Sequence, residues 1–582
     1  MKKIPIKILI LTLALFTTLL VLISCNNSEK NPESENTVSE QPTAVPSDTS
    51  ADIPEVIEGN EMMIFRDGAY TCNIICSDRA TEVEKEVYNK LRNDLKSLTG
   101  VMPAFTTDFV SYNDNGSARK LPAILIGETN YVESNEAYAS LCYGSGSINL
   151  IGNKLVFAFS SVEEGASLCA QFSNLIKNYS DQEIFADISG LPFKAVVNQA
   201  LANIPLLPYK SAESVDCGDN THLVRISKVG AEDFANYKQI LTEEGYSLVN
   251  TREAAGHLYA TFVRDDIYVY TYYKPNSQTI RVITGPKEHL PNTDTESEKI
   301  ALPSLTLLGQ SYSDIGLGMV YRLPNGQFVV FDGGADYSKD FVYKAIKAEA
   351  VTEEISIAAW FLSHSHGDHY EAFVDFVENH IDEISIETVV FNFATEDRYA
   401  KIDGEETNKS MNTIREILAT TLADTKIIKA HTGQVLEFGG IPFEVLYTCE
   451  DFYPSSFQYL NDTSLVVRAF VEGKSILMLA DATYTVGAVL IEAYRDYLKS
   501  DIVQLAHHGI WASIDKLYTY IDADVLIWPS NASNAKKWIT DGAVRAAIAP
   551  VTDIYLPGPS SVKIEFPYVF KNNKAEFIAQ HT

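Results

Sequence analysis

The pattern of apolar and polar positions predicts a small α/β domain in residues 61–197. In the run TEVEKEVYNKLRNDLKSLTG, apolar side chains recur every three or four positions, which is typical of an amphipathic helix, and the final Gly100 suits a C-terminal cap. Strand-like runs follow at 122–127 and 153–159, and a second amphipathic helix begins near Ser161. This alternation of helix and strand patterns favours a mixed α/β fold.

Residues 211–290 have a different pattern. The run AEDFANYKQILTEEGY has helical spacing, and it is followed by the tyrosine-rich runs HLYATFV and IYVYTYY. Strict alternation with tyrosine predicts an antiparallel sheet that is exposed on one face. We therefore expect a small α+β domain, followed by a linker around PNTDTESEK.

Residues 300–582 alternate strand and helix patterns, and polar clusters follow several apolar runs. The run ISIAAWFL is typical of a strand buried on both faces, and GDHYEAFVDFVENH has helical spacing. His364, His366, Asp368 and His369 therefore lie in a strand-to-helix turn, where α/β proteins form their sites. Imidazole and carboxylate groups are the ligands that zinc and similar metals prefer. So many ionisable groups beside a buried strand would be costly unless they are paired or metallated.

Three further strands also end in candidate ligands. Asp332 follows QFVVF, Asp481 follows SILMLA, and the pair His507 and His508 follows DIVQLA.

The motif H-x-H-x-D-H resembles the signature of the metallo-β-lactamase superfamily, and the downstream order of aspartate and histidine matches that family. The resemblance covers about half the chain. It implies an αββα sandwich of two sheets faced by helices at 300–582, preceded by the two small α/β or α+β domains. It also implies that Asp332 braces the metal loop, which is the turn that contains His364, His366, Asp368 and His369. In such a site His364 and His366 would hold a first metal, and Asp481 would bridge to a second.

The same resemblance assigns Asp368, His369 and His507 to the second metal. We prefer His507 over His508 because it is closer to the strand end. Asp368 would also orient the attacking water, and His508 would protonate the leaving group or hold a phosphate oxygen. Three aromatic side chains could line the pocket or serve only in packing: Tyr370, Tyr453 and Trp511.

Many family members complete the first site with a histidine in a G-H-T loop, where this chain offers only Asn461 and Asp462. The first site is therefore open or completed by oxygen. We expect two divalent ions, zinc or alternatively manganese, with a single ion as the other possibility.

The N-terminus predicts export. Three lysines precede an apolar run at 8–23, and the following LISC resembles a bacterial lipobox. Residues 1–25 would be a lipoprotein signal peptide, with Cys25 lipidated and the protein anchored on the outer face of the cell membrane. A single membrane-spanning helix is the alternative. Residues 26–60 contain no aromatic side chain and read as a disordered tether.

The net charge and the number of cysteines each exclude one class of protein. The net charge of −31 argues against a protein that grips a long polyanion such as nucleic acid. The six cysteines other than Cys25 are too sparse for a disulfide scaffold, and we expect buried thiols with at most one disulfide in the N-terminal half.

The motifs NDTSLVV and HHG resemble the hydrolase domain of ComEC-type competence proteins, whose members are taken to cut phosphodiester bonds. We therefore expect a membrane-anchored, metal-dependent hydrolase of phosphodiesters or other esters, acting on a small molecule or a cell-envelope component. A β-lactamase or lactonase is one alternative, and a cell-surface binding protein that retains the fold without catalysis is another.

Overall fold

The computed structural model describes residues 57–109, 118–139, 141, 145–180, 183–196, 205, 207, 212–291, 298–310, 315–336, 339–399, 402 and 405–582. The expected signal peptide, Cys25 and nearly all of the expected tether lie outside these residues. The chain divides into two compact units, Met1–Pro54 and Glu55–Thr582, and every described residue belongs to the second. None of the helices in the described part is both long and apolar enough to span a membrane.

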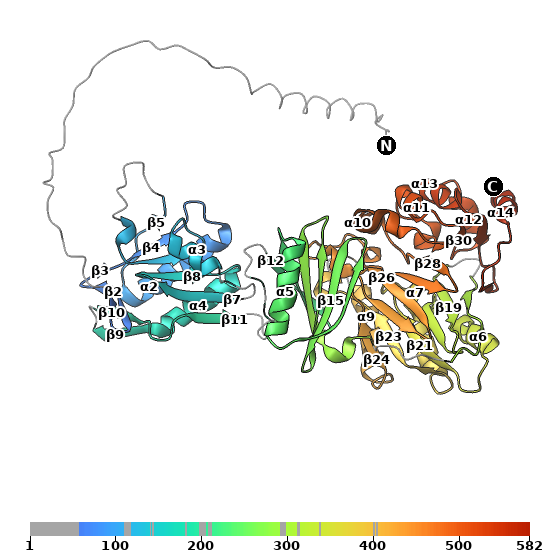
Figure 1. Ribbon diagram of the computed structural model, residues 1–582, viewed down its shortest axis with the longest axis horizontal. Coiled ribbons are helices and arrows are strands. Elements are labelled where there is room, and N and C mark those ends of the chain that lie inside the picture. Colours follow the sequence, from blue (N-terminus) through green and yellow to red (C-terminus); the bar gives the residue numbers. More distant parts are fainter. Residues whose placement is uncertain are drawn as a thin grey trace, which may run out of the picture. The chain divides into compact units, whose positions relative to one another are not determined.

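The described part of residues 57–196 contains two sheets and three α-helices. Most of these elements are labelled in Figure 1. The first sheet contains β1 (Ile57–Glu58), β2 (Glu61–Arg66), β10 (Glu183–Asp187) and β9 (Ile176–Ser180) in that order, with β3 (Ala69–Tyr70) paired to β2. The second contains β11 (Phe193–Val196), β7 (Ser145–Ile151), β8 (Lys154–Ala158), β6 (Ala123–Ile126), β4 (Asn73–Cys76) and β5 (Thr106–Thr107). The helices are α2 (Glu82–Thr99), α3 (Val132–Ala139) and α4 (Val162–Leu175), and η2 (Ala118–Lys120) is a 3-10 turn.

The helix ends in this region follow local sequence signals. Thr81 and Ser161 each form a capping box at the start of α2 and α4. Gly100 ends α2 in the left-handed conformation, with φ 76°. The two helices and the strands β6 and β8 therefore confirm the predicted pattern.

The middle segment is one antiparallel sheet with a helix on one face (Figure 1). Its strands, in order, are β12 (Ala212–Gly218), β13 (Thr221–Ser227), β17 (Thr279–Pro286), β16 (Ile267–Lys274), β15 (His257–Arg264) and β14 (Ser247–Ala254). The helix is α5 (Ala231–Glu243), and η4 (Lys287–His289) follows the sheet.

The prediction that this sheet is exposed on one face was wrong. Phe262 and Val269 are buried beneath α5, in a core that this helix shares with the sheet. On the opposite face, Tyr259, Tyr268 and Tyr270 are buried in a core that also contains C-terminal residues. Tyrosine alternation did not mean exposure here because the hydroxyl groups find partners across that contact, as Tyr270 Oη does by donating to the Thr432 carbonyl at 2.9 Å.

The C-terminal segment contains two large mixed sheets. The first runs β24 (Lys426–Lys429), β23 (Thr388–Phe391), β21 (Ser356–Phe361), β20 (Phe328–Asp332), β19 (Gly318–Arg322), β18 (Ser304–Leu307) and β32 (Val562–Glu565), with β22 (Ser385–Ile386) paired to β21. The second runs β25 (Val435–Phe438), β26 (Ile441–Tyr447), β27 (Val466–Val471), β28 (Lys474–Met478), β29 (Ile502–Gln504), β30 (Val525–Ile527) and β31 (Asp553–Tyr555).

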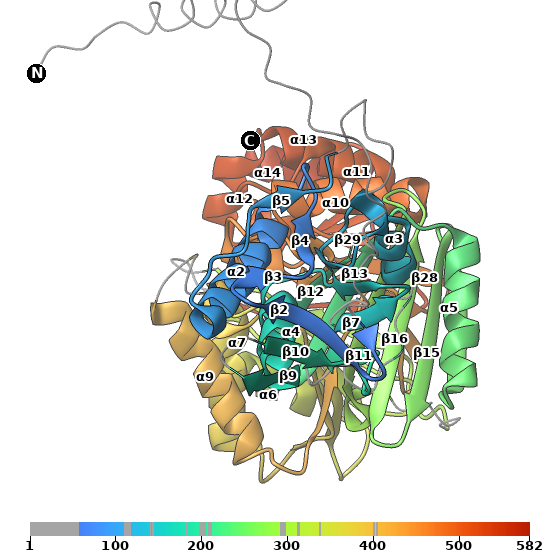
Figure 2. The ribbon, with the colours of Figure 1, turned by 90° about the vertical axis from the view of Figure 1, so that its left-hand side faces the viewer.

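Helices flank these sheets, with α10–α14 together at the top of Figure 2 and α9 at the lower left. They are α6 (Lys339–Glu349), α7 (Gly367–His380), α8 (Glu396–Tyr399), α9 (Glu405–Ala419), α10 (Tyr484–Tyr494), α11 (Asp515–Ile521), α12 (Ala532–Trp538), α13 (Gly542–Ile548) and α14 (Lys574–His581). Short 3-10 turns are η6 (Cys449–Phe452), η7 (Leu460–Thr463), η8 (Arg495–Leu498) and η9 (Ala506–Gly509).

The two C-terminal sheets share one apolar core. Phe331 and Phe361 from the first sheet and Phe443 from the second are buried in it, and the Phe361 and Phe443 rings lie 5.4 Å apart. Helices α6 and α7 contribute to a second core with the first sheet, whereas α10, α11 and α13 contribute to a third with the second sheet. Strands β20 and β21 are parallel neighbours, as are β28 and β29, so the segments that follow each pair leave from one edge.

The described cysteines add no disulfide to the fold. The described cysteines Cys72, Cys76, Cys169, Cys217 and Cys449 are all free and buried, as expected for apolar thiols, and no disulfide joins any two of them. Cys142 lies outside the described residues.

Candidate metal centre

The metal loop follows β21 directly. This strand is buried along nearly its whole length, and His364 is fully buried three residues beyond its end. His366 is the N-cap residue of α7, so Asp368 and His369 lie in the first turn of that helix. The predicted strand-to-helix turn is therefore confirmed.

Asp332 holds this loop in place from the neighbouring strand end. Its carboxylate accepts hydrogen bonds from the Ser363 backbone amide at 2.7 Å and from the Ser363 hydroxyl at 2.8 Å. The same carboxylate lies 2.8 Å from His369 Nδ1. A proton on Nδ1 leaves Nε2 of His369 as the ligand atom, which is the usual arrangement in metal-binding histidines.

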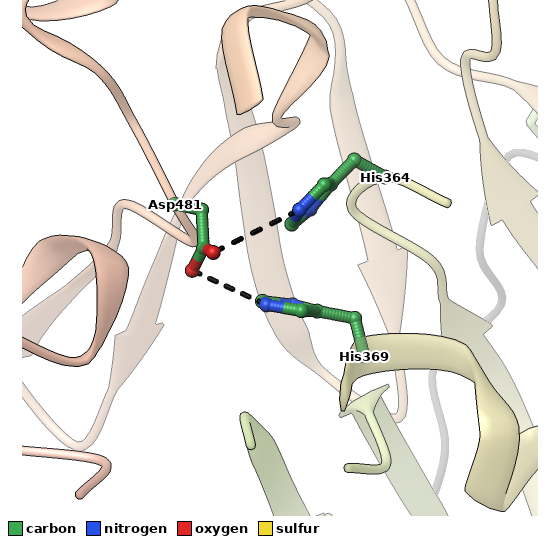
Figure 3. A group of neighbouring side chains, drawn as sticks. All are labelled: His364, His369 and Asp481. Carbon is green, nitrogen blue, oxygen red and sulfur yellow. Dashed lines mark ion pairs between the residues drawn. The ribbon is translucent and has the colours of Figure 1, made fainter. Parts of the chain in front are cut away.

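His364, His369 and Asp481 converge from different strand ends, and Figure 3 shows both imidazoles directed at the carboxylate. His364 Nε2 lies 3.8 Å from Asp481 Oδ2, and His369 Nε2 lies 3.2 Å from Asp481 Oδ1. The exposed fractions of the three side chains are at most 2%. These residues come from the loop after β21, from α7 and from the segment after β28, so the fold brings together ligands that are distant in sequence.

A second group contains Asp368, His369 and His508. His508 Nε2 lies 3.2 Å from Asp368 Oδ2 and 3.5 Å from Asp481 Oδ1. The other ring nitrogen of His508 is 3.0 Å from the Pro529 carbonyl, which directs Nε2 toward the carboxylates.

The second histidine of the pair at 507–508 is the one that completes the second group. Here His508 is the histidine grouped with Asp368 and His369, a place for which the sequence favoured His507. Nearness to the strand end did not decide the matter, because both residues adopt left-handed backbone conformations, with φ 49° and 55°. The chain turns sharply there, and it is the second imidazole that lies beside Asp368.

His507 lies beside the first group. Its Nε2 atom is 3.7 Å from Asp481 Oδ2 and 3.2 Å from Asn461 Nδ2. His366 Nδ1 lies 3.0 Å from His364 Nε2. The sequence offered only Asn461 and Asp462 there, and the structure adds the imidazole of His507 beside the Asn461 amide. Only the backbone turn at His507 could have indicated this, and the sequence does not reveal it.

Unpartnered buried atoms test whether a metal fits. His369 Nε2, His508 Nε2 and Asp481 Oδ1 are buried and have no hydrogen-bond partner. Buried polar atoms are nearly always paired, so three such atoms at one point are costly unless a cation binds them. Nitrogen and carboxylate oxygen atoms within 4.8 Å of one another form a suitable donor set for zinc, manganese or iron. The residues present therefore fit a metal.

Electrostatics agree with this donor set. Burial raises the pKa of Asp481, but His369 and His508 outweigh it and hold that pKa well below its usual range. Burial, reinforced by His369, keeps the pKa of His364 well below its ordinary value, so this imidazole is neutral. Burial lowers the pKa of His369, but Asp481 and Asp332 outweigh it and hold that pKa well above its ordinary value. Protons therefore compete with a cation for this centre.

Other aromatic and histidine side chains differ in their position relative to the centre. Trp511 is 72% exposed and its ring centroid lies 6.4 Å from that of His507, so it stands at the rim of the centre. Tyr453 is buried in the core, and the Tyr370 hydroxyl donates to Ser410 Oγ at 2.9 Å. His431 pairs with Glu450 and takes no part in the centre.

Comparisons with known proteins are weak. No protein-family model matches the chain, and no curated protein matches it. A structure of CmlA, a diiron β-hydroxylase from Streptomyces venezuelae, matches with 13% identity and a TM-score of 0.29 over 49% of this chain and 55% of that one. A mutant of the CmlA β-hydroxylase gives 14% and 0.30 over 46% and 55%. The long form of RNase Z from yeast gives 10% and 0.30 over 50% and 45%.

Each match spans about half the length of the solved protein. Scores of this size do not define a shared fold. What the structure itself defines is a mixed α/β protein with buried His/Asp groups suited to metal binding.

Proposed function

We propose that the chain is a metal-dependent hydrolase of the metallo-β-lactamase superfamily that uses two divalent ions. The observation that carries this proposal is the convergence of His364, His369 and Asp481, with His508 beside them, around buried atoms that lack hydrogen-bond partners. The order of ligands along the chain supports it, because each follows a strand end as the family signature requires.

The layer order is consistent with the proposed αββα sandwich. Two sheets share a core, and each sheet has a further core with helices. Candidate ligands follow β21 in one sheet and β28 in the other, as a centre shared by the two sheets of such a sandwich would require.

Each residue around the proposed centre would have a distinct role. Asp481 contacts both groups and would hold both ions, while Asp332 orients His369 through Nδ1. Asp368 is 33% exposed, so its carboxylate can accept a hydrogen bond from the attacking water and orient it. When bound, two divalent ions supply a water of lowered pKa and neutralise negative charge that develops on the substrate.

The substrate would be a phosphodiester or another ester. The motifs NDTSLVV and HHG support the phosphodiester class, and the net charge of −31 favours a small molecule or an envelope component over long nucleic acid. The lipobox-like sequence ending in Cys25 supports anchoring on the outer face of the membrane. Zinc suits the nitrogen and oxygen donors, with manganese as the alternative.

Turnover of model substrates tests the proposal. The metal-loaded protein should hydrolyse bis-p-nitrophenyl phosphate, with p-nitrophenyl acetate and nitrocefin assayed in parallel to separate a diesterase from a simple esterase and a β-lactamase. Metal analysis should give close to two equivalents. A metal-loaded protein that cleaves none of the three would contradict the hydrolase proposal.

Asp481→Ala gives the sharpest variant. It removes the carboxylate shared by both groups, so turnover should fall by at least about a thousandfold, as for loss of a group that acts in the transition state. The matched control is Asp496→Ala, which alters an exposed aspartate in η8 and should leave turnover unchanged. Near-normal activity in Asp481→Ala would refute the role given to this residue.

A further inference from the structure

A polar cavity lies between the middle sheet and the C-terminal segment. It has a volume of about 310 Å³, and none of its lining residues belongs to the candidate metal centre. Strands β15, β16 and β17 line one side, and η6 and α10 line the other. The cavity therefore belongs to the contact between two parts of the fold.

Buried charges line this cavity. Lys274 and Arg281 are buried residues, the Asp451 side chain is 2% exposed, and Lys274 pairs with Asp451. Two cations thus face one carboxylate among the buried lining residues, which leaves one positive charge without a carboxylate partner. Burying a charge in this way is costly unless an anion or several dipoles offset it.

Arg281 is held rigidly by carbonyl groups. Its Nη1 atom donates to the Glu450 carbonyl at 2.6 Å, and Nη2 donates to the carbonyls of Asp451 at 3.0 Å and Tyr453 at 3.1 Å. Its Nε atom is buried and has no hydrogen-bond partner. The guanidinium is therefore preorganised and retains one unused donor.

His257 also lines the cavity and supplies an independent observation that points to a ligand. It is fully buried, and its Nδ1 atom lies 3.1 Å from the Tyr259 hydroxyl. Its Nε2 atom is buried with no hydrogen-bond partner. Burial, reinforced by Lys274, lowers the pKa of His257 to about 4, so the ring is neutral. A hydrogen bond from Tyr259 to Nδ1 would leave an N–H at Nε2 as a donor.

We propose that this cavity is a binding site for one small oxyanion group, a carboxylate or a phosphate, held by His257, Lys274 and Arg281. The volume is at the small end of ligand pockets, so the ligand has the size of a simple metabolite. Donors that are already held in place favour a compact anion, because they need no rearrangement on binding. This site is separate from the proposed hydrolase centre and does not depend on it.

Titration calorimetry on the full chain tests this site, with inorganic phosphate in one arm and succinate in the other. A chelator is present so that neither anion binds through a metal at the first centre. One of the two anions should bind saturably at one equivalent, and the arm that responds identifies the ligand class.

Two variants probe the cavity by different routes. His257→Phe removes the Nε2 donor while keeping a ring, and Ala493→Phe fills the cavity from its half-buried position on α10 without touching a buried charge. Each should weaken binding at least tenfold. The matched control Ala488→Phe places the same ring on the exposed face of the same helix and should bind normally, as should Asp481→Ala.

The outcomes separate cleanly. Binding lost in a folded Ala493→Phe variant supports the site even if His257→Phe fails to fold. Binding that survives in both cavity variants, or the absence of binding of either anion to the unaltered chain, would overturn the proposal and leave a cavity occupied only by water.

Discussion

At the scale of the residue, Asp332 governs the metal loop without facing the centre. It adopts a left-handed backbone conformation, with φ 59°, at the end of β20, and is fully buried. A strained, buried aspartate persists only where its contacts determine the position. The contacts to Ser363 and His369 do so here.

Asp332→Asn should lower metal affinity by about 10–100-fold, because a neutral amide binds the His369 N–H more weakly and can turn the ring. Competition with a chromophoric zinc chelator measures this. Asp340→Asn, which alters an exposed aspartate paired with Lys344, is the matched control and should not change affinity. Equal affinities in both variants would show that the brace is dispensable.

The different positions of His507 and His508 give a second prediction at this scale. His508→Ala removes a buried imidazole whose Nε2 faces Asp368, so the protein should retain about one metal equivalent fewer after gel filtration. His507→Ala alters a side chain that is 26% exposed and grouped with Asn461, and its loss of metal should be smaller. Metal analysis of the two variants decides, and the reverse order would favour the assignment made from sequence.

At the scale of the element, the hairpin of β25 and β26 meets the middle sheet through a glycine. Gly433 precedes the hairpin with φ 92°, and a Cβ atom there would lie 1.9 Å from the Tyr259 ring. Both the backbone conformation and the close approach therefore require glycine.

Gly433→Ala should destabilise the fold by about 2–4 kcal/mol, from left-handed strain plus overpacking against Tyr259. Gly440→Ala is the matched control, because Gly440 also has a positive φ, of 82°, but a Cβ atom there would meet nothing within 4 Å. Its cost should be about 1 kcal/mol. Urea unfolding measures both, and equal costs would show that the contact with Tyr259 yields easily.

At the scale of the whole molecule, a buried charge network joins the middle sheet to the C-terminal sheets. Glu444 on β26 accepts hydrogen bonds from Arg468, at 2.6 Å to Nη2, and from Arg252 on β14. Arg252 also donates to the Gly433 carbonyl at 2.6 Å. Together with the shared tyrosine core, this network makes the middle sheet part of one packed body with the C-terminal segment.

This network predicts a pH dependence. Burial raises the pKa of Glu444, but Arg468 and Arg252 outweigh it and leave that pKa below its ordinary value of 4.5. A depressed pKa contributes stability above pH 4.5, and that contribution is lost as the pH falls through the folded-state value. The free energy of unfolding should therefore fall steeply below pH 4.5.

Glu444→Gln should remove that part of the slope and cost about 3 kcal/mol at pH 7, because the buried Arg468 and the partly buried Arg252 lose their carboxylate. Glu492→Gln, at an exposed glutamate, is the control and should keep the slope of the unaltered chain. Urea unfolding at pH 7 and at pH 4 gives the comparison. Identical slopes in the three proteins would exclude Glu444 as the source.

Local signals in the sequence determined the helix ends at Thr81, Gly100 and Ser161, and the position of the metal loop after β21, because caps and apolar runs act between neighbouring residues. Tertiary structure alone decided the burial of the tyrosine-rich sheet, since a distant segment covers it. It also decided that the His508 imidazole lies beside Asp368 and that the His507 imidazole lies beside the Asn461 amide. Two consecutive left-handed residues set those directions, and only long-range packing stabilises such a backbone.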